Sequence, residues 1–490
     1  MSGTIFLLIP VLLPILGGLL VGLVRPLRKK KPCRLVTGAF LLASSLCMLR
    51  SALFLPGHQL ILWYLTPGMP ILLRLDDVSR FFLGLVAIMW VLSGCYSFEY
   101  MNHEREEHRF QAFYLITMGI LSGLTMAGNL VTFYLFYEAM TLMTLPLVLH
   151  TRTKESIAAA VKYLIYSVFG ASAALLGIFY LNHACASLAF VPGGTLLPEA
   201  DRNTVLWISF VMILGFGTKA GMFPLHGWLP TAHPVAPAPA SAVLSGVITK
   251  MGVLGILRTV YFCVGADTLR DTWVQTVWMI LALITVFMGS MLALKEDIFK
   301  KRLAYSSVSQ VSYILFALAT LTAAGFQGAL LHVLFHSAIK ITLFMTAGAV
   351  IVQTGLTHVS DMKGLGKRMP LVLVLFTVVS LGLIGIPPSG GFVSKWWIAS
   401  GAMELSSAFA FLGPATLLLS AILTAAYLLT ISIQGFFPGK DVDTATLSPA
   451  SPGPLMWIPM LLLSLLVLLG GMFPESFLDF FAGISASLML

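Results

Sequence analysis

Stretches of about 20 apolar residues recur along the chain, separated by short polar segments, and this pattern restricts the fold more than any other feature. As an α-helix, a stretch of about 20 residues crosses the roughly 30 Å hydrocarbon layer of a bilayer. A transmembrane β-barrel would instead alternate apolar and polar residues over segments of about 10 residues. Of the 490 residues, 58% are hydrophobic and 10% are charged, whereas soluble domains have about 25% charged residues. The sequence therefore predicts an all-α polytopic membrane protein.

About 14 transmembrane helices are expected, and two of them are interrupted. Gly/Pro runs break the seventh helix at GMFPLHGWLP (221–230) and the twelfth at GIPPSGG (385–391). Backbone groups freed by such breaks are tolerated within a bilayer only where they face protein or a watery cavity. The expected spans are residues 4–24, 35–55, 78–98, 110–127, 130–149, 158–182, 204–222, 240–262, 273–294, 303–323, 328–352, 369–402, 408–435 and 455–473.

Helices four to eight and nine to thirteen form two units of five. Because five is an odd number, the two units would cross the membrane in opposite senses, as inverted repeats do. The segment KYLIYSVFGASAALLG (162–177) can be laid on HVLFHSAIKITLFMTAG (332–348). The predicted organisation is three amino-terminal helices in 1–108, a first repeat in 109–262, a second, inverted repeat in 263–435, and a last helix in 436–490.

The basic residues are distributed among the loops as the positive-inside rule describes. A net charge of +9 would suggest nucleic-acid binding in a soluble protein, but here the topology explains it, and no nucleic-acid partner is expected. With the amino terminus outside, the basic clusters at 25–34, 105–109, 152–154 and 295–302 face the cytoplasm. Fourteen crossings then place the carboxyl terminus outside as well. The first helix has no basic stretch before it, so we expect it to be retained rather than cleaved as a signal peptide.

The expected loops are short, so neither a soluble catalytic domain nor a catalytic centre is predicted in this chain. The five cysteines are scattered, without a CxxC pair or a metal-ligand spacing. We therefore expect no cofactor and no metal site in this chain. Any redox chemistry would come from a partner.

Glu138, in NLVTFYLFYEAMTL, is the acid expected deepest in the hydrocarbon. Ionisable groups at this depth are costly and usually mark an ion or proton path. Tyr134 precedes it by one turn, and Thr141 and Thr144 follow on adjacent positions, so hydroxyls and water could solvate the carboxylate. The alternative is a structural carboxylate that locks two helices together.

Lys219 ends the first part of helix seven, beside the break. Lysine suits a proton carrier because burial lowers its pKa from about 10 toward neutrality, while a nearby carboxylate raises it again. A pair formed by Lys219 and Glu138 would therefore act as a switch. The alternative is a lysine that snorkels to the surface.

Three ionisable residues in helix eleven share one stripe. His332, His336 and Lys340 follow at i, i+4 and i+8. An HxxxH pair can bind a metal, but the third member is a cation and no carboxylate or cysteine is close in sequence, so a proton relay is the better interpretation. Ordinary core histidines are the other alternative. Lys250, in the middle of helix eight, is expected to act as a relay because snorkelling from there is difficult.

Helix ten carries LAYSSVSQ, in which four polar residues could line a file of water or serve as ordinary packing contacts: Ser306, Ser307, Ser309 and Gln310. Lys395 follows the break in helix twelve and is the expected exit to the outer face. One acid against four membrane lysines leaves few carboxylates to replace the water shell of Na⁺, so protons are the expected ion, with Na⁺ restricted to a neighbouring subunit.

These motifs resemble those of the antiporter-like membrane subunits shared by respiratory complex I, Mrp-type multisubunit cation/proton antiporters and membrane-bound energy-converting hydrogenases. The resemblance covers roughly residues 70–435. It is carried by YEAMTL (137–142), KAGMFPLHGWLPTAHPVAPAPASAVLSGVITK (219–250), LAYSSVSQ (303–310), HVLFHSAIK (332–340) and GIPPSGGFVSKWW (385–397). It implies fourteen helices, inverted five-helix repeats and a central hydrophilic axis. It also implies proton-carrying roles for Glu138, Lys219, Lys250, His332, His336, Lys340 and Lys395.

The resemblance further implies a bacterial or archaeal inner membrane and partners that include other membrane subunits, some of them antiporter-like. Lys395 in the GFVSKWW context is more similar to the D-type component of Mrp antiporters and its hydrogenase counterparts than to the complex I member with an acid there. The expected function is proton translocation driven by redox partners that carry iron-sulfur clusters and nickel or flavin. The alternatives are a D-like component of an Mrp-type Na⁺/H⁺ antiporter without a redox partner, and a membrane scaffold whose buried charges are structural.

Overall fold

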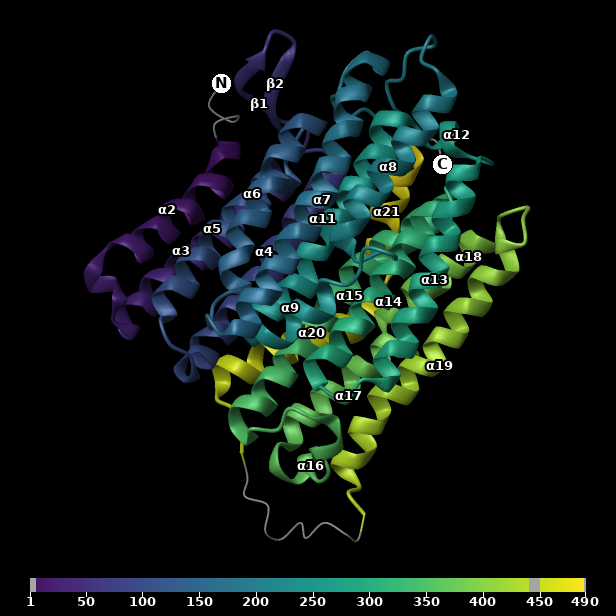
Figure 1. Ribbon diagram of the computed structural model, residues 1–490. Helices are drawn as coiled ribbons and strands as arrows, with labels where there is room; N and C mark the ends of the chain where they lie inside the picture. Colours follow the sequence, from purple (N-terminus) through teal and green to yellow (C-terminus); the bar gives the residue numbers. More distant parts are fainter. Residues whose placement is uncertain (1–5, 440–449, 489–490) are drawn as a thin grey trace.

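The computed structural model describes residues 6–439 and 450–488, and most of them belong to long helices that lie side by side (Figure 1). The first residues of the expected first helix (1–5) and parts of the expected carboxyl-terminal segment (440–449 and 489–490) lie outside the described residues. Within the described part of the chain, eleven helices are long and apolar enough to cross a membrane. This finding confirms the helical membrane fold that the composition predicts.

The region before the first repeat contains six helical segments and one hairpin. They are η1 (Phe6–Leu8), α2 (Ile9–Leu23), η2 (Arg25–Arg28), α3 (Lys30–Phe54), β1 (Gln59–Thr66), β2 (Met69–Arg74), α4 (Asp77–Tyr100) and η3 (Met101–His103). The first unit of five then consists of α5 (Glu107–Thr125), α6 (Leu130–Val148), α7 (Lys154–Ala184), α8 (Arg202–Ala220) with α9 (Leu229–Val235), and a long composite helix. That helix runs through α10 (Ala238–Val243), η4 (Leu244–Ile248), α11 (Thr249–Arg258) and η5 (Thr259–Val264), and η4 and η5 are π-helical.

The second unit follows the short helix α12 (Ala266–Leu269). Its elements are α13 (Trp273–Lys295), α14 (Phe299–Ala319), α15 (Ala323–Thr354), η6 (Val359–Asp361), α16 (Leu365–Arg368), α17 (Pro370–Ile384), α18 (Gly390–Met403) and α19 (Phe409–Phe436). The chain closes with α20 (Pro454–Met472) and α21 (Glu475–Ser487).

Each of the fourteen expected spans corresponds to one of these helices or to a broken pair. Besides the eleven long apolar helices, α5 and α14 occupy expected spans but carry more polar residues, and α17 and α18 together form the interrupted twelfth span. The antiparallel hairpin of β1 and β2 is an addition that the sequence patterns did not predict. Its turn at Pro67 and Gly68, where Gly68 has φ +87°, folds back an apolar segment that is too short to cross a bilayer.

The two five-helix units repeat the same helix pairings. In the first unit α5 packs on α6, α6 on α7, and α7 on α8. In the second unit α13 packs on α14, α14 on α15, and α15 on α18. The units run in opposite senses, because α7 ends and α15 begins against the same segment, η5. The thiol of Cys185, directly after α7, contacts the Cys263 carbonyl at 3.8 Å, and Phe326 near the start of α15 packs on Tyr261 at 5.1 Å between ring centroids.

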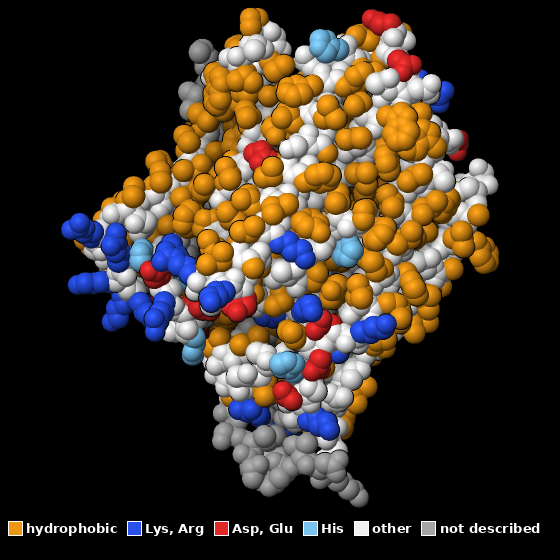
Figure 2. All heavy atoms as spheres, viewed as in Figure 1, with side chains coloured by type: hydrophobic (Ala, Val, Ile, Leu, Met, Phe, Trp, Pro, Cys, Tyr) orange, Lys and Arg blue, Asp and Glu red, His pale blue; other side chains and the backbone are white. Residues whose placement is uncertain are grey.

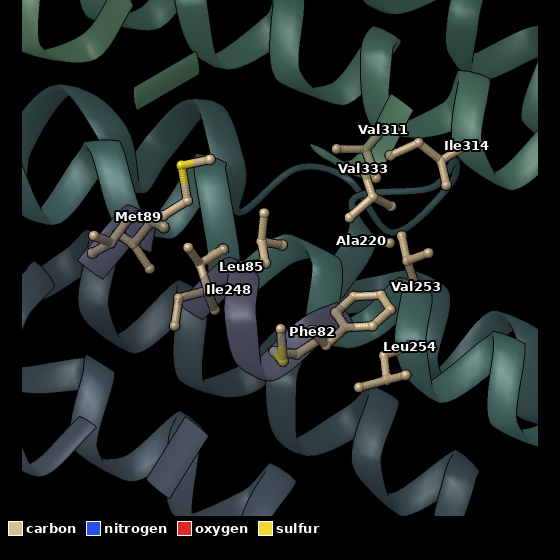
Figure 3. Packing of buried hydrophobic residues seen from close by; sticks show 14 of the residues in the cluster. Phe82, Leu85, Met89, Ala220, Ile248, Val253, Leu254, Val311, Ile314 and Val333 are labelled. Carbon is tan, nitrogen blue, oxygen red and sulfur yellow. The ribbon is translucent and has the colours of Figure 1, made fainter. Parts of the chain in front are cut away.

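The core lies between α4, the composite helix and α15. In the most apolar 18-residue stretch of the segment from Ala238 to Val264, every residue is buried. In the corresponding stretch of α15, 89% of the residues are buried. Figure 3 shows Phe82 and Leu85 of α4 beside Ile248 of η4 and Val253 of α11, with Val333 of α15 nearby. The two helices that carry Lys250 and the His/Lys stripe are therefore, together with α14, strongly enclosed by the rest of the bundle.

A buried ion pair ties α4 to the composite helix. Asp76 caps α4 by accepting a hydrogen bond from the Ser79 amide at 2.8 Å. Arg258 donates to both carboxylate oxygens of Asp76, each at 2.7 Å, and its side chain is 1% exposed. The guanidinium lies over the rings of Phe190 and Phe262, at 4.7 and 4.6 Å. Burial raises the pKa of Asp76, but Arg258 outweighs this effect and holds that pKa below its usual value.

Replacing Asp76 by Asn is expected to lower the free energy of unfolding by about 3 kcal/mol, because Arg258 would keep its buried charge without a counter-ion. Asp77→Asn is the matched control, since Asp77 is 54% exposed and pairs only with Arg80 one turn away. Thermal unfolding of the purified chain in detergent measures both variants. Equal melting temperatures for the two would contradict a structural role for the pair.

Candidate functional site

Lys219 lies in the last turn of α8, where the helix ends at Gly221 with φ +84°. Its ammonium donates three hydrogen bonds, to Thr141 Oγ1 of α6 at 2.9 Å and to Tyr163 OH and Ser167 Oγ of α7 at 3.0 and 2.8 Å. The side chain is 1% exposed. A buried cation is thus solvated by hydroxyls in place of water.

Close packing of α7 on α8 makes these bonds reachable. A Cβ on Gly170 of α7 would lie 2.5 Å from the carbonyl oxygen of Gly215, so the two backbones touch at this point. Tyr163 and Ser167 stand two turns and one turn before Gly170 on the same helix. The contact therefore brings both hydroxyls to the end of α8.

Glu138 lies on α6, one turn before the Lys219 partner Thr141, and it is only half-buried. Among the described residues Glu138 has no ion-pair partner, and its Oε1 accepts no hydrogen bond. In this conformation Lys219 is bound to hydroxyls rather than to Glu138, so the expected pair is open. Tyr134 is half-buried one turn earlier, and Thr144 bonds Tyr163 OH at 2.6 Å instead of facing the carboxylate.

Lys250 is fully buried at the point where the π-helix η4 gives way to α11. Its ammonium donates to the Ser245 carbonyl oxygen at 2.5 Å. A π-helix loosens the normal backbone pairing and is frequent at functional sites, and here a backbone oxygen of that segment solvates the lysine. The Ser245 hydroxyl bonds Ser307 Oγ at 2.6 Å. This bond links η4 to the polar residues of α14, the expected helix ten.

Lys340 of α15 is joined to the same helix. Its ammonium donates to Ser306 Oγ at 2.6 Å and to the Leu303 carbonyl oxygen at 3.1 Å. The hydroxyl of Tyr427, on α19, also donates to Ser306 Oγ at 2.7 Å. Lys340 therefore contacts Ser306 of α14 directly, whereas Lys250 bonds the backbone of Ser245, whose hydroxyl bonds the adjacent Ser307.

The two histidines of the stripe stack on each other, with ring centroids 5.5 Å apart. His332 Nδ1 bonds Ser394 Oγ of α18 at 2.9 Å. Within the described ranges no protein group bonds His332 Nε2, either ring nitrogen of His336, or the side-chain amide of Gln310. Buried polar atoms are normally satisfied by protein or ordered water. These buried atoms without protein partners are where ordered water would complete the hydrogen bonding.

Lys395 lies in the second turn of α18, after the second break. Its ammonium donates to the carbonyl oxygens of Leu383 and Ile384, at 2.5 and 3.0 Å, which are the end of α17. It also lies 4.9 Å from the ring centroid of Tyr313, which in turn stacks on the His332 ring. Lys395 is therefore joined to the histidine pair through Tyr313.

Most of the predicted site residues fall into three polar groups, together called the line: Lys219 with its three hydroxyls, Lys250 and Lys340 beside α14, and the histidine pair with Lys395. Glu138 and Gln310 lie without a bonded partner among the described residues. Ser309 bonds Ser290 Oγ of α13 at 2.8 Å and the Val286 carbonyl at 2.8 Å, which are helix-packing contacts. Tyr134 is not among the hydroxyls that hold Lys219. Their expected part in lining a water path stays a prediction.

Several polar partners were missed by sequence reasoning. Tyr163 and Ser167 follow each other at i and i+4, a spacing that could have marked a hydroxyl face on α7. Tyr427 carries no such local signal, because α19 meets α14 only through the fold. His233 of α9 is fully buried and stacks on Phe344, one turn beyond Lys340, at 4.6 Å between ring centroids. Its two ring nitrogens have no hydrogen-bond partner in 6–439 or 450–488.

The described residues contain no group of three His, Cys, Asp or Glu that could hold a metal ion. The ionisable residues of the three polar groups are four lysines and two histidines, and the Glu138 carboxylate lies beside them without an ion-pair partner among the described residues. Such a set can pass protons between neighbouring groups, because lysine and histidine nitrogens exchange them directly.

Comparison with known proteins places this arrangement in a wider group. NADH-quinone oxidoreductase subunit N of Desulforudis audaxviator (strain MP104C) is 34% identical over 465 residues, which cover 90% of this chain and 92% of the relative. Hydrogenase-4 component B of Escherichia coli (strain K12) is 33% identical over 352 residues, or 68% of this chain and 51% of that protein. A chain in the structure of the Mrp complex from Dietzia sp. DQ12-45-1b shares the fold with a TM-score of 0.85, at 22% identity, over 100% of this chain and 98% of that one.

Residues 127–424 match the family described as NADH:quinone oxidoreductase/Mrp antiporter, TM, and this match spans the broken helices and the buried lysines. The chain belongs to this family of antiporter-like membrane subunits.

Proposed function

We propose that this chain is a proton-translocating, antiporter-like subunit of a multisubunit membrane complex. The observation that carries the proposal is the set of four buried lysines, each held by hydroxyl or carbonyl oxygens, that lies with two stacked histidines from the first helix break to the second. Ionisable groups are kept at membrane depth only at high cost. Protons would move along Glu138, Lys219, Lys250, Lys340, His336, His332 and Lys395.

The first step concerns Lys219. In the open conformation three hydroxyls hold its ammonium, and a rotation toward Glu138, one turn from Thr141, would replace neutral acceptors by a charged one. A carboxylate partner favours the protonated lysine, whereas hydroxyl partners favour it less. Closing the pair would load a proton on Lys219, and opening it would let the proton pass inward.

The middle step follows from like charges. Lys340 bonds Ser306 of α14, and Lys250 bonds the backbone of Ser245, whose hydroxyl bonds the adjacent Ser307. The two ammonium groups lie close enough to disfavour each other's charge. Binding of a proton by Lys250 or Lys340 would therefore promote release of a proton from the other lysine. Water held by the free nitrogens of His336 and by Gln310 would carry it toward His332 and Lys395.

Protons suit this line better than Na⁺. A bare Na⁺ ion needs oxygen ligands in place of its water, and the line offers cationic ammonium groups and one open carboxylate. A Na⁺ site would have to come from a neighbouring subunit. This argument favours proton transport for this chain whether its complex is a redox pump or an antiporter.

The complex itself is assigned by analogy. Relatives named as a quinone oxidoreductase subunit and a hydrogenase component support partners with redox chemistry, in which iron-sulfur clusters and nickel or flavin would lie outside this chain. Further antiporter-like subunits would sit beside it, and the alternative is an Mrp-type Na⁺/H⁺ antiporter without a redox partner. We place the chain in a bacterial or archaeal cell membrane. We also propose repeat boundaries at 109–262 and 263–435.

Both chain ends are proposed to lie outside. The N and C labels mark the same end of the bundle (Figure 1), and Figure 2 shows most of the visible Lys and Arg side chains below a broad hydrophobic face, away from that end. The positive-inside rule then makes the basic end cytoplasmic.

Lys219→Ala is expected to reduce proton pumping by the complex at least about tenfold, because it removes a proton carrier. Lys162→Ala is the matched control, since Lys162 is a half-buried lysine that bonds Thr231 at 3.1 Å outside the line. Acidification of proteoliposomes, followed with a pH-sensitive dye, measures both. Full pumping by Lys219→Ala together with poor assembly would favour the scaffold alternative.

His336→Gln tests the carrier role because it removes the titratable ring but keeps most of the volume of a fully buried side chain. We expect pumping to fall about tenfold or more, with a much smaller effect on the melting temperature of the complex than truncation to Ala would have. His358→Gln, at an exposed loop histidine, is the control. A histidine that only fills the core would instead lose stability and keep its transport rate.

Purification of the complex through a tag on this chain, followed by mass spectrometry, tests the proposed partners. Copurifying subunits with iron-sulfur, nickel or flavin centres are expected. A preparation that contains only small membrane subunits would reject the redox-driven form and identify an antiporter.

A further inference from the structure

A cavity of about 590 Å³ opens between α2, α5 and α6, at the end of the bundle where basic residues gather. Its inner part is apolar and is lined by Gly18 and Gly22 of α2, Phe113 and Ile116 of α5, and Met143 of α6. Neither the proton path nor the helix breaks use these residues. A volume of a few hundred Å³ with apolar walls is typical of a small-ligand site.

The shape of the cavity follows from the two glycines. A Cβ on Gly18 would lie 2.5 Å from the Ala112 carbonyl oxygen, so α2 and α5 touch there, whereas a Cβ on Gly22 would lie 3.3 Å from the Ala112 side chain. The helices therefore separate toward the basic end. On α5, Arg109, Phe113 and Ile116 follow at i, i+4 and i+7, a stripe about 10 Å long that leads from the charged rim into the apolar part.

Three arginines form the rim, and one acid offsets them only in part. Arg109 and Arg152 share the Glu106 carboxylate, at 2.8 and 3.4 Å, while Arg28 in η2 has no ion-pair partner among the residues that the structure describes. His150, just after α6, contacts the rim residue Arg109. Burial, together with Arg109, lowers the pKa of His150 to about 4, so His150 is neutral at pH 7 and adds no charge to the rim. The rim keeps an excess of positive charge.

A second, more polar cavity of about 440 Å³ adjoins the first and shares Glu106, Arg109 and Arg152 with it. Glu106 and Arg152 have φ of +53° and +55°, left-handed conformations that non-glycine residues seldom adopt. Both strained residues thus lie at the junction of a polar cavity with an apolar one. A ligand that fills the two would have a polar head and an apolar tail.

We propose that this site binds one anionic phospholipid from the leaflet on the basic side of the bundle. The acyl chain would lie along Gly22, Phe113 and Ile116, and the phosphate would face Arg28, Arg109 and Arg152. Guanidinium groups pair with phosphate oxygens through two parallel hydrogen bonds. The excess positive charge selects an anionic headgroup over a zwitterionic one, and basic pockets between membrane helices are known to bind such headgroups. This inference is independent of the proposed transport function.

The test uses the complex purified through a tag on the full chain, titrated with phosphatidylglycerol in detergent and followed by native mass spectrometry. Arg28→Gln combined with Arg152→Gln is expected to weaken binding about fivefold for each arginine removed. Arg25→Gln combined with Lys29→Gln is the matched control, because it removes the same charge from neighbouring exposed positions that do not line the cavity. Equal affinity for the two double variants would overturn the proposal.

A second variant separates a lipid from other occupants. Gly22→Leu keeps every arginine but fills the apolar part, so it is expected to weaken phosphatidylglycerol binding as well. Weakening by the arginine variant alone would indicate a soluble phosphate and overturn the lipid assignment. Crosslinking of Gly22→Cys to another subunit of the complex would show that a protein occupies the groove, which also overturns it.

Discussion

The structure depends on one constraint, which is that an ammonium group inside a membrane must be solvated by the protein. Among the described residues, none of the four central lysines has a carboxylate within ion-pair distance. Hydroxyls hold Lys219, a hydroxyl and a carbonyl oxygen of α14 hold Lys340, and backbone carbonyl oxygens hold Lys250 and Lys395. For Lys250 and Lys395 these oxygens come from irregular places in the helices, a π-segment and the second break. Departures from regular helix are thus one of the means by which charge is kept at depth, beside hydroxyl side chains.

The same constraint decides where the helices must touch. Oxygens can reach a lysine only if neighbouring helices approach closely, and glycine permits this in both units. Gly170 and Gly215 bring α7 onto α8, and a Cβ on Gly391 of α18 would lie only 1.9 Å from the Gly382 carbonyl of α17. Small residues at helix contacts are the usual route to close packing in membranes, where burial of apolar surface gives little drive.

The helical spans could be predicted because each depends on local composition, and so could the lysines and histidines, because charge stands out in apolar sequence. The hairpin of β1 and β2 could not, since its pairing depends on a turn rather than on length. Nor could the open state of Glu138, because the choice of Lys219 between carboxylate and hydroxyls is a matter of three-dimensional geometry. Partners such as Tyr427 come from helices distant in sequence, and a single sequence carries no sign of them.

Lys395, an ionisable residue of α18, bonds the end of α17 across the break between these two half-helices. The ammonium sits on two carbonyls at the negative end of a helix dipole, beside Gly385 with φ +95°. When this lysine gives up its proton, both hydrogen bonds lose their charge assistance and the dipole loses its counter-charge. The two hydrogen bonds that join α18 to the end of α17 would then weaken. Loss of one proton from Lys395 would in this way loosen the contact between α17 and α18, the two halves of the broken helix.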